Sequence, residues 1–205
     1  MLSNLVLIIV VSYLMGSVPF GYLLGKIIKR IDIREHGSGN VGATNVLRVL
    51  GWKIGLIAFL LDLLKGFGAV LFAKLIMPES SLIYIFAGLT AIVGHMFTIF
   101  LRFKGGKGVA TSAGVFAALI PVSILIALLC FIVVTIISRY VSLSSIVAAI
   151  ALIVVQSVFT FRNGMQNIEY LILVIIVAGF IVFKHKTNIS RLINGTENKI
   201  SFRSK

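Results

Sequence analysis

The chain has 205 residues, of which 59% are hydrophobic and 12% are charged, and its mean hydropathy is +1.11. Soluble domains are roughly 45–50% apolar and about 25% charged, so this composition excludes an ordinary soluble protein and indicates one integral-membrane domain over residues 1–205. Nineteen Lys and Arg against six Asp and Glu give a formal net charge of +13. In a membrane protein this excess marks cytoplasmic loops rather than a nucleic-acid surface, and it also attracts anionic lipids or phosphorylated substrates.

The first apolar run covers residues 5–24 and is long enough to cross a bilayer. No small-residue cleavage pattern follows it and no basic region precedes it, which predicts a retained span rather than a signal peptide. Pro19 removes a backbone donor, so we expect the cytoplasmic end of this span to bend. The small residues at positions 16–22 fit helix packing at least as well as ligand binding.

A polar, glycine-rich segment follows at residues 36–51 (HGSGNVGATNVLRVLG). If it turns helical after Gly42, Asn45 and Arg48 share one face. The guanidinium of Arg48 suits a phosphate, and the exposed amides at the helix start also favour an anion. The alternative is a flexible cytoplasmic loop whose glycines only make turns.

Residues 54–77 and 82–101 are the next two predicted spans, joined by a short turn without a positive residue, as an external loop should be. Asp62 and Lys65 lie three residues apart inside the first of these spans. Charges inside a span are expensive, so the two side chains form either a structural ion pair or a functional site. His95 lies in the other span, where a packed, hydrogen-bonded histidine is the more common case.

A second basic glycine loop covers residues 102–108 (RFKGGKG). It resembles a phosphate-binding loop but lacks the Walker pattern, because no glycine lies five residues before Gly106, and Gly108 follows Lys107 instead of Ser or Thr. Nucleotide hydrolysis is therefore not expected. The six acidic residues offer no pair suited to a metal, and the single Cys130 excludes a disulfide framework or a thiolate metal site.

The remaining apolar runs are residues 109–137, 141–158 and 168–183. If the first of them is one helix, the chain has six spans. If it breaks at Pro121, the chain has seven, and all basic segments, including the tail, come to the cytoplasmic side. The break leaves two short helices of roughly 20–25 Å against a hydrocarbon core of about 30 Å. We predict an all-α membrane helix bundle of about seven spans, with the N-terminus outside and the C-terminus cytoplasmic.

Three segments carry a resemblance to a known family. Residues 32–48 (DIREHGSGNVGATNVLR) resemble the first motif of the bacterial acyl-phosphate:glycerol-3-phosphate acyltransferases. Residues 103–111 (FKGGKGVAT) are similar to the second motif, and residues 184–192 (KHKTNISRL), with Glu197, to the third. The motifs occur in the family's order and extend over nearly the whole chain. Thr98 departs from the pattern, because the family has a proline there, and this affects the expected local helix bend.

The resemblance implies an enzyme of the bacterial cytoplasmic (inner) membrane with seven spans and an active site that faces the cytoplasm. Such an enzyme transfers a fatty acyl group from acyl phosphate to the sn-1 hydroxyl of glycerol 3-phosphate, giving lysophosphatidic acid and phosphate. Because an acyl phosphate is an activated mixed anhydride, the reaction needs no cofactor or metal. The expected partners are the two substrates and the lipid bilayer.

These motifs give two sets of candidate site residues. Arg48 and Lys107 are expected to neutralise phosphate, and His185 or a substrate phosphate oxygen to accept the hydroxyl proton. Glu197 is expected to be structural rather than catalytic. The candidate catalytic residues are Ser38, Arg48, Lys107 and His185, and the candidate substrate-binding residues are Asn45, Lys104, Gly105, Gly106, Gly108 and Asn188.

Two other functions are compatible with a basic membrane protein. A transporter of a phosphorylated metabolite typically shows inverted repeats and helices broken at the midplane. Here the two halves show no repeat, and the polar groups cluster at one face. A scaffold that docks partners through its basic loops leaves the order of glycine, serine and arginine unexplained.

Overall fold

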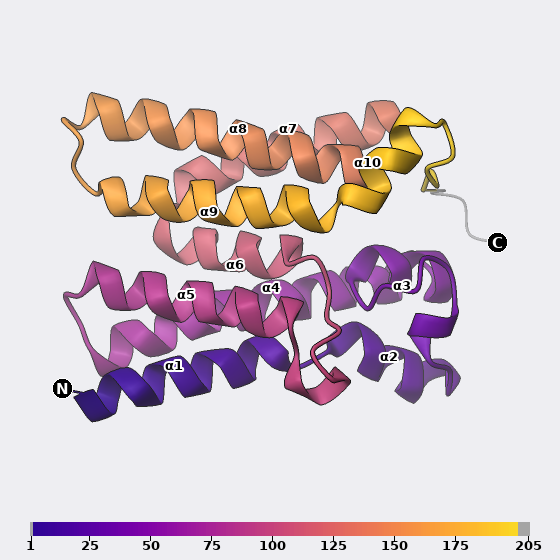
Figure 1. Cartoon of the computed structure of the whole chain (residues 1–205), viewed down its shortest axis with the longest axis horizontal. Coiled ribbons are helices and arrows are strands. Elements are labelled where there is room, and N and C mark those ends of the chain that lie inside the picture. Colours follow the sequence, from indigo (N-terminus) through magenta and orange to yellow (C-terminus); the bar gives the residue numbers. More distant parts are fainter. Residues whose placement is uncertain (1, 201–205) are drawn as a thin grey trace. The chain divides into compact units, whose positions relative to one another are not determined.

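A computed structural model describes residues 2–200, and every regular element in this range is helical, which confirms the all-α prediction for this part of the chain. The chain folds as two compact units (Figure 1), one that ends at Ala118 and one that begins at Leu119.

The first unit is built around a long central helix, α4. Helices α1 and α5 pack against α4 and against each other, and α2 and α3 also pack against α4. In chain order the elements are α1 (Leu2–Ser17), α2 (Phe20–Lys29), η1 (Ile33–Glu35), α3 (Ala43–Leu50), α4 (Trp52–Ile76), α5 (Ser81–Met96), η2 (Ile99–Leu101) and α6 (Val109–Leu119).

The bend predicted at Pro19 is present, because α1 ends at Ser17 and α2 begins at Phe20. A helix end leaves carbonyl groups without intrahelical partners, and in a lipid environment these groups need another donor. Thr98 Oγ1 donates to the Ser17 carbonyl at 2.6 Å, and Lys65 Nζ donates to the Val18 carbonyl at 2.8 Å. Two side chains from other parts of the unit therefore stabilise the break.

Thr98 also produces the bend at the end of α5 that the missing proline had put in doubt. Its hydroxyl accepts a hydrogen bond from the Phe100 amide at 3.3 Å and so caps η2. The helix ends at Met96, and the chain turns without a proline.

The ion pair predicted inside the second span is also present. Lys65 Nζ lies 2.7 Å from Asp62 Oδ1, and both side chains are almost completely buried. The predicted ion pair is therefore confirmed.

The second unit consists of helices that pack in sequence order, α7 on α8 and α8 on α9. Pro121 is the first residue of α7, which confirms the predicted helix break. At about 1.5 Å per residue, the 11 residues of α6 rise only about 16 Å, whereas the 18 residues of α7 rise about 27 Å. The elements are α7 (Pro121–Ser138), α8 (Val141–Arg162), α9 (Ile168–Lys184) and α10 (Lys186–Ile193).

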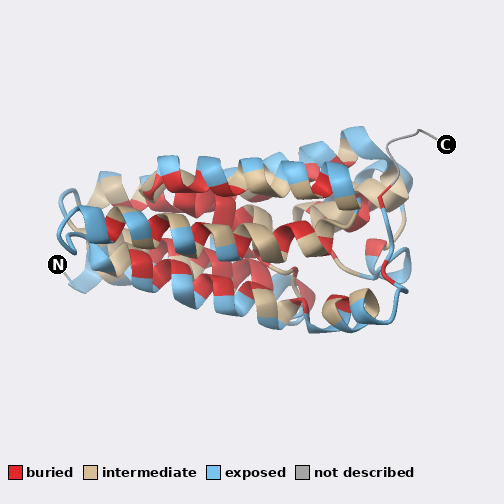
Figure 2. Ribbon diagram, turned by 90° about the horizontal axis from the view of Figure 1, so that it is seen from above, coloured by how far each residue is buried: buried red, intermediate tan, exposed pale blue. Residues whose placement is uncertain are grey.

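Five helical segments of the described chain are long and apolar enough to cross a membrane, and the first of them, Leu2–Lys29, combines α1 and α2. Helices α9 and α10, bent by 58°, make a sixth if they are one span. Buried and exposed turns alternate along the helices (Figure 2), and large apolar side chains such as Leu64 and Leu129 are exposed. Exposed apolar side chains of this kind suit a protein surrounded by lipid.

Candidate active site

The polar segment after the first span forms a hydrogen-bonded turn followed by a helix. Helix α3 begins directly after Gly42, as predicted, and the turn before it uses Gly37 and Gly39 at φ values of +61° and +71°. Such positive values favour glycine, because a Cβ atom is strained there. Ser38 lies between these two glycines and is exposed.

Asn45 holds this segment in place from the inside. Its side chain is buried, and its Oδ1 accepts from the Ser38 amide at 2.8 Å. Its Nδ2 donates to the carbonyl groups of Ile33 and His36, each at 3.0 Å. A methyl group at Gly37 would overlap Oδ1, so only glycine allows this approach. The Asn45 amide is therefore engaged with backbone groups that position Ser38.

The second glycine loop is attached to the end of α5. The Gly105 amide donates to the Met96 carbonyl at 3.2 Å, and the Gly106 amide donates to the His95 carbonyl at 3.0 Å. Gly108 has a φ of +86° and accepts from the Ser112 amide at 2.8 Å, which starts α6. Lys107 is half-buried at this helix start.

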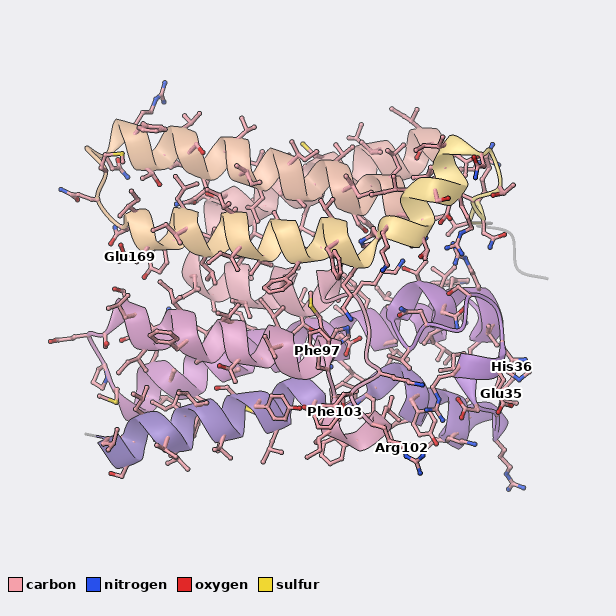
Figure 3. The ribbon with its side chains drawn as sticks, viewed as in Figure 1. Glu35, His36, Phe97, Arg102, Phe103 and Glu169 are labelled. Carbon is pink, nitrogen blue, oxygen red and sulfur yellow. The ribbon has the colours of Figure 1, made fainter. Side chains whose placement is uncertain are left out.

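The two glycine segments meet at a pocket of about 370 Å³ in the first unit. Two of the predicted site residues, Lys104 and Gly105, line this pocket. Ser38, Arg48 and Lys107 are not among its lining residues. Glu35, a lining residue, and Arg102, two residues before Lys104, lie toward the same end of the unit (Figure 3). The lining residues are Asp32, Arg34, Glu35, Gly39, Asn40, Val41, Lys104 and Gly105.

Asp32 and Arg34 form an ion pair at this pocket that the sequence analysis had not singled out. Arg34 Nη2 lies 2.6 Å from Asp32 Oδ2, and Arg34 Nε donates to Oδ1 at 3.0 Å. The hydrogen bond from Arg34 lowers the pKa of Asp32 to about 2. The guanidinium carbon of Arg34 also lies 5.1 Å from the centre of the Tyr22 ring. The Asp-x-Arg spacing at the start of the first motif could have predicted this ion pair.

His185 and Asn188 belong to the second unit, where they lie one helical turn apart. His185 is buried at the start of α10, and its Nδ1 lies 2.7 Å from the Ile181 carbonyl oxygen. Because a carbonyl only accepts, we assign the proton of this contact to Nδ1. Asn188 is also buried, and its Nδ2 donates to Glu197 Oε1 at 2.8 Å.

Glu197 accepts three hydrogen bonds from different parts of the second unit. Besides Asn188, Ser142 Oγ donates to Oε1 at 2.9 Å, and Arg191 Nε donates to Oε2 at 2.7 Å. Burial alone would raise the pKa of Glu197, but the hydrogen bonds from Arg191, Asn188 and Ser142 outweigh it and hold the pKa below its ordinary value. The carboxylate connects α10 to the start of α8, which is the structural role that the resemblance implied.

A sequence model of one protein family matches residues 6–195, and that family is described as glycerol-3-phosphate acyltransferase. The chain belongs to this family. A glycerol-3-phosphate acyltransferase of Desulforamulus reducens is 47% identical over 195 residues, covering 95% of this chain and 94% of the relative. One of Fusobacterium nucleatum is 47% identical over 197 residues, covering 95% and 97%.

Solved structures lead to the same glycerol-3-phosphate acyltransferase family. A crystal structure of PlsY (YgiH), an integral membrane glycerol 3-phosphate acyltransferase, in its glycerol 3-phosphate form has a TM-score of 0.86 at 40% identity and covers 96% of both chains. Its lysophosphatidic acid form has a TM-score of 0.84 at 40% identity and covers 96% of this chain and 95% of that one. The resemblance noted from the three motifs is confirmed.

Proposed function

We propose that this protein transfers a fatty acyl group from an acyl phosphate to the sn-1 hydroxyl of glycerol 3-phosphate, giving lysophosphatidic acid and inorganic phosphate. The observation that carries the proposal is the family match over residues 6–195. A solved relative at 40% identity has a form with glycerol 3-phosphate and a form with lysophosphatidic acid, which are the acceptor and the product of this reaction.

The reaction needs positioning and charge neutralisation more than it needs a strong nucleophile. The sn-1 oxygen attacks the acyl carbonyl carbon, the bond from that carbon to the phosphate oxygen breaks, and phosphate leaves with the electron pair. Holding both reactants in line and stabilising the developing oxyanion lower the barrier. An acyl phosphate is activated already, so this chemistry needs no metal or cofactor.

We assign the roles as follows. Arg48 and Lys107 neutralise phosphate, while Ser38, Lys104 and the amides of the Gly105–Gly108 loop bind phosphate or the oxyanion. His185 and Asn188 orient glycerol 3-phosphate. The hydroxyl proton goes either to Nε2 of His185 or to a substrate phosphate oxygen. Asn45 acts by holding the Ser38 turn, because its amide is engaged with that backbone.

The membrane topology that fits this function has seven spans, with α6 as the short one, in one domain of the bacterial inner membrane. With seven spans the N-terminus lies outside, and the basic residues of segments 26–53, 102–107 and 184–199 all face the cytoplasm. Non-helical backbone is tolerated at membrane depth where protein covers it, and Gly106 and Gly108 next to α6 are buried.

Labelling of Ser38→Cys and Thr187→Cys from either side of sealed vesicles tests this topology, after the native Cys130 has been replaced. Labelling of the two positions from opposite sides would contradict it.

The activity is tested with purified protein in detergent, glycerol 3-phosphate and either acyl phosphate or acyl-coenzyme A at equal concentration. We expect lysophosphatidic acid and phosphate from acyl phosphate without added metal or nucleotide. Arg48→Ala and Lys107→Ala should each lower kcat/KM by about 100- to 1000-fold. Lys53→Ala, which removes an exposed cation outside the motifs, is the matched control and should keep the wild-type rate. No product from folded wild-type protein would reject the proposal.

A further inference from the structure

A buried cluster in the first unit takes no part in the chemistry described above. Asp62 and Lys65 on α4 and His95 on α5 have side chains that are 2%, 4% and 6% exposed. Lys65 Nζ lies 2.7 Å from Asp62 Oδ1, and His95 Nδ1 lies 3.6 Å from the same oxygen. Buried ionisable groups inside a span are costly, so a cluster of three calls for an explanation beyond packing.

His95 lies directly against the second glycine loop. Its carbonyl accepts the Gly106 amide at 3.0 Å, and the next carbonyl, that of Met96, accepts the Gly105 amide at 3.2 Å. The ring packs against the same loop, because a methyl group built on Gly106 would overlap Nε2 and lie 2.9 Å from Cε1. One edge of the imidazole, at Nδ1, thus faces Asp62, and the other edge, at Nε2, faces Gly106.

The carboxylate behind His95 is fixed from several sides. Lys65, its ion-pair partner, donates to the Val18 carbonyl at 2.8 Å, at the break between α1 and α2. The adjacent Gly66 lies so close to the first turn of α6 that a methyl group there would overlap the Thr111 carbonyl oxygen. Lys65 is therefore hydrogen-bonded to the α1–α2 break, and α4 packs closely on α6, the helix that follows the glycine loop.

We propose that His95 is a positioning residue of the reaction. Held by Asp62, its imidazole forms a rigid support that sets the position of the Gly105–Gly108 amides toward the substrate. This inference rests on the proposed function, because that function assigns the loop amides to phosphate or to the oxyanion. A glycine is needed at position 106 because the ring occupies the space that a Cβ atom would take.

Four variants of the full-length protein test this support. Gly106→Ala should push the loop off the ring and lower kcat/KM by about 100-fold, the size of effect that a displacement near 1 Å causes. His95→Ala removes the support but makes room for the methyl group, so the double variant should be at least about tenfold faster than Gly106→Ala alone. His95→Gln keeps a polar side chain without the flat ring, and it should raise the KM of at least one reactant at a normal folded fraction. Gly88→Ala, also on α5, brings a methyl group against the Val115 side chain away from the loop and is the matched control.

Each assay is normalised to folded protein by thermal unfolding in detergent, because loss of folded enzyme lowers the maximal rate without changing a KM. We expect Gly88→Ala to lower the unfolding midpoint with both KM values unchanged. A double variant no faster than Gly106→Ala would overturn the inference, as would His95→Gln with wild-type kcat and KM. Wild-type protein that makes no lysophosphatidic acid would instead reject the proposed function, so the two failures are distinguishable.

Discussion

The two segments that carry the first and third motifs are held by opposite chemistry. In the first unit a neutral amide, Asn45, makes three hydrogen bonds to backbone groups of the Ser38 turn. In the second unit a carboxylate, Glu197, accepts three hydrogen bonds from the side chains of Ser142, Asn188 and Arg191. We call Asn45 and Glu197 the two anchor residues, because each is buried and joins a functional segment to the rest of its unit.

The difference between the anchors has physical consequences. Hydrogen bonds to a charged group contribute about 1.5–3 kcal/mol each, against about 1 kcal/mol for neutral pairs. The charged anchor therefore holds its segment more strongly, but it depends on pH and requires burial of a carboxylate. The neutral anchor is weaker and insensitive to pH.

The largest effect is expected from Glu197→Ala. It removes the acceptor of all three hydrogen bonds and leaves Asn188 Nδ2 and Ser142 Oγ buried without this partner. The free energy of local unfolding should fall by about 2–4 kcal/mol, a value that counts the Arg191 contact only in part because that side chain is partly exposed. Because Asn188 then loses its fixed orientation, the KM for glycerol 3-phosphate should rise about 100-fold. Steady-state kinetics and hydrogen exchange of the α10 amides measure the two effects.

Glu169→Ala is the control for this substitution, since Glu169 lies in the first turn of α9, at the opposite end of that helix from α10 (Figure 3). It should leave both the kinetics and the exchange of α10 unchanged. Wild-type exchange of α10 in Glu197→Ala would show that the carboxylate does not anchor this helix.

Asn45→Ala tests the neutral anchor and should have a smaller effect on stability. Two carbonyl groups and one amide of the turn lose their buried partner, at a cost of about 1–3 kcal/mol. Because the Ser38 turn then loosens, kcat/KM should fall about 30- to 100-fold with the rest of the unit intact. Thr44→Ala, at the neighbouring position of α3, serves as the control. If Asn45→Asp, which keeps the acceptor for the Ser38 amide but loses both donors, retained full activity, the two carbonyl contacts would be unimportant.

The helices and their breaks were predictable because the information is local. Pro19 and Pro121 each remove a backbone donor at their own position, and the structure breaks at both. The apolar runs predicted the long apolar helices for the same reason. The third motif showed His185 and Asn188 at helical spacing, although the sequence alone did not delimit α10 within the polar tail.

The structural role of Glu197 was expected from the resemblance, but the role of Asn45 and the partners of Glu197 were not predictable, because they depend on contacts between distant residues. Asn45 has the hydrogen-bonding groups of a substrate ligand, and only the fold shows that its amide is engaged with the turn. Ser142 contacts Glu197 across 55 residues and carries no motif signal. The packing of His95 against the glycine loop was missed for a similar reason, since a lone histidine in an apolar run gives no indication of what its ring contacts.

A fall in pH should destabilise the segment held by Glu197 but not the segment held by Asn45. The pKa of folded Glu197 is lowered from its ordinary value of 4.5, so its stabilising contribution is complete above pH 4.5 and is lost as the pH falls through the lowered value. Asn45 does not titrate, and Asp32 in the same segment keeps its charge down to a pKa of about 2. Hydrogen exchange, corrected for intrinsic rates, should therefore show α10 loosening below pH 4.5 while α3 remains protected. Equal loss of protection in both helices would contradict this difference.

The smallest effect should come from Ser142→Ala, which removes one of the three donors to the charged anchor. Glu197 keeps its contacts with Asn188 and Arg191, so the loss should be about 1 kcal/mol, and the KM for glycerol 3-phosphate should rise about fivefold. Ser144→Ala on the same helix is a close control, because Ser144 is also buried but donates at 2.9 Å to the Tyr140 carbonyl of its own helix end. If the two serine variants had the same KM, Ser142 would contribute only packing. A rise confined to Ser142→Ala would mean that the anchor transmits the loss of one hydrogen bond to Asn188, as expected for a single carboxylate shared by three donors.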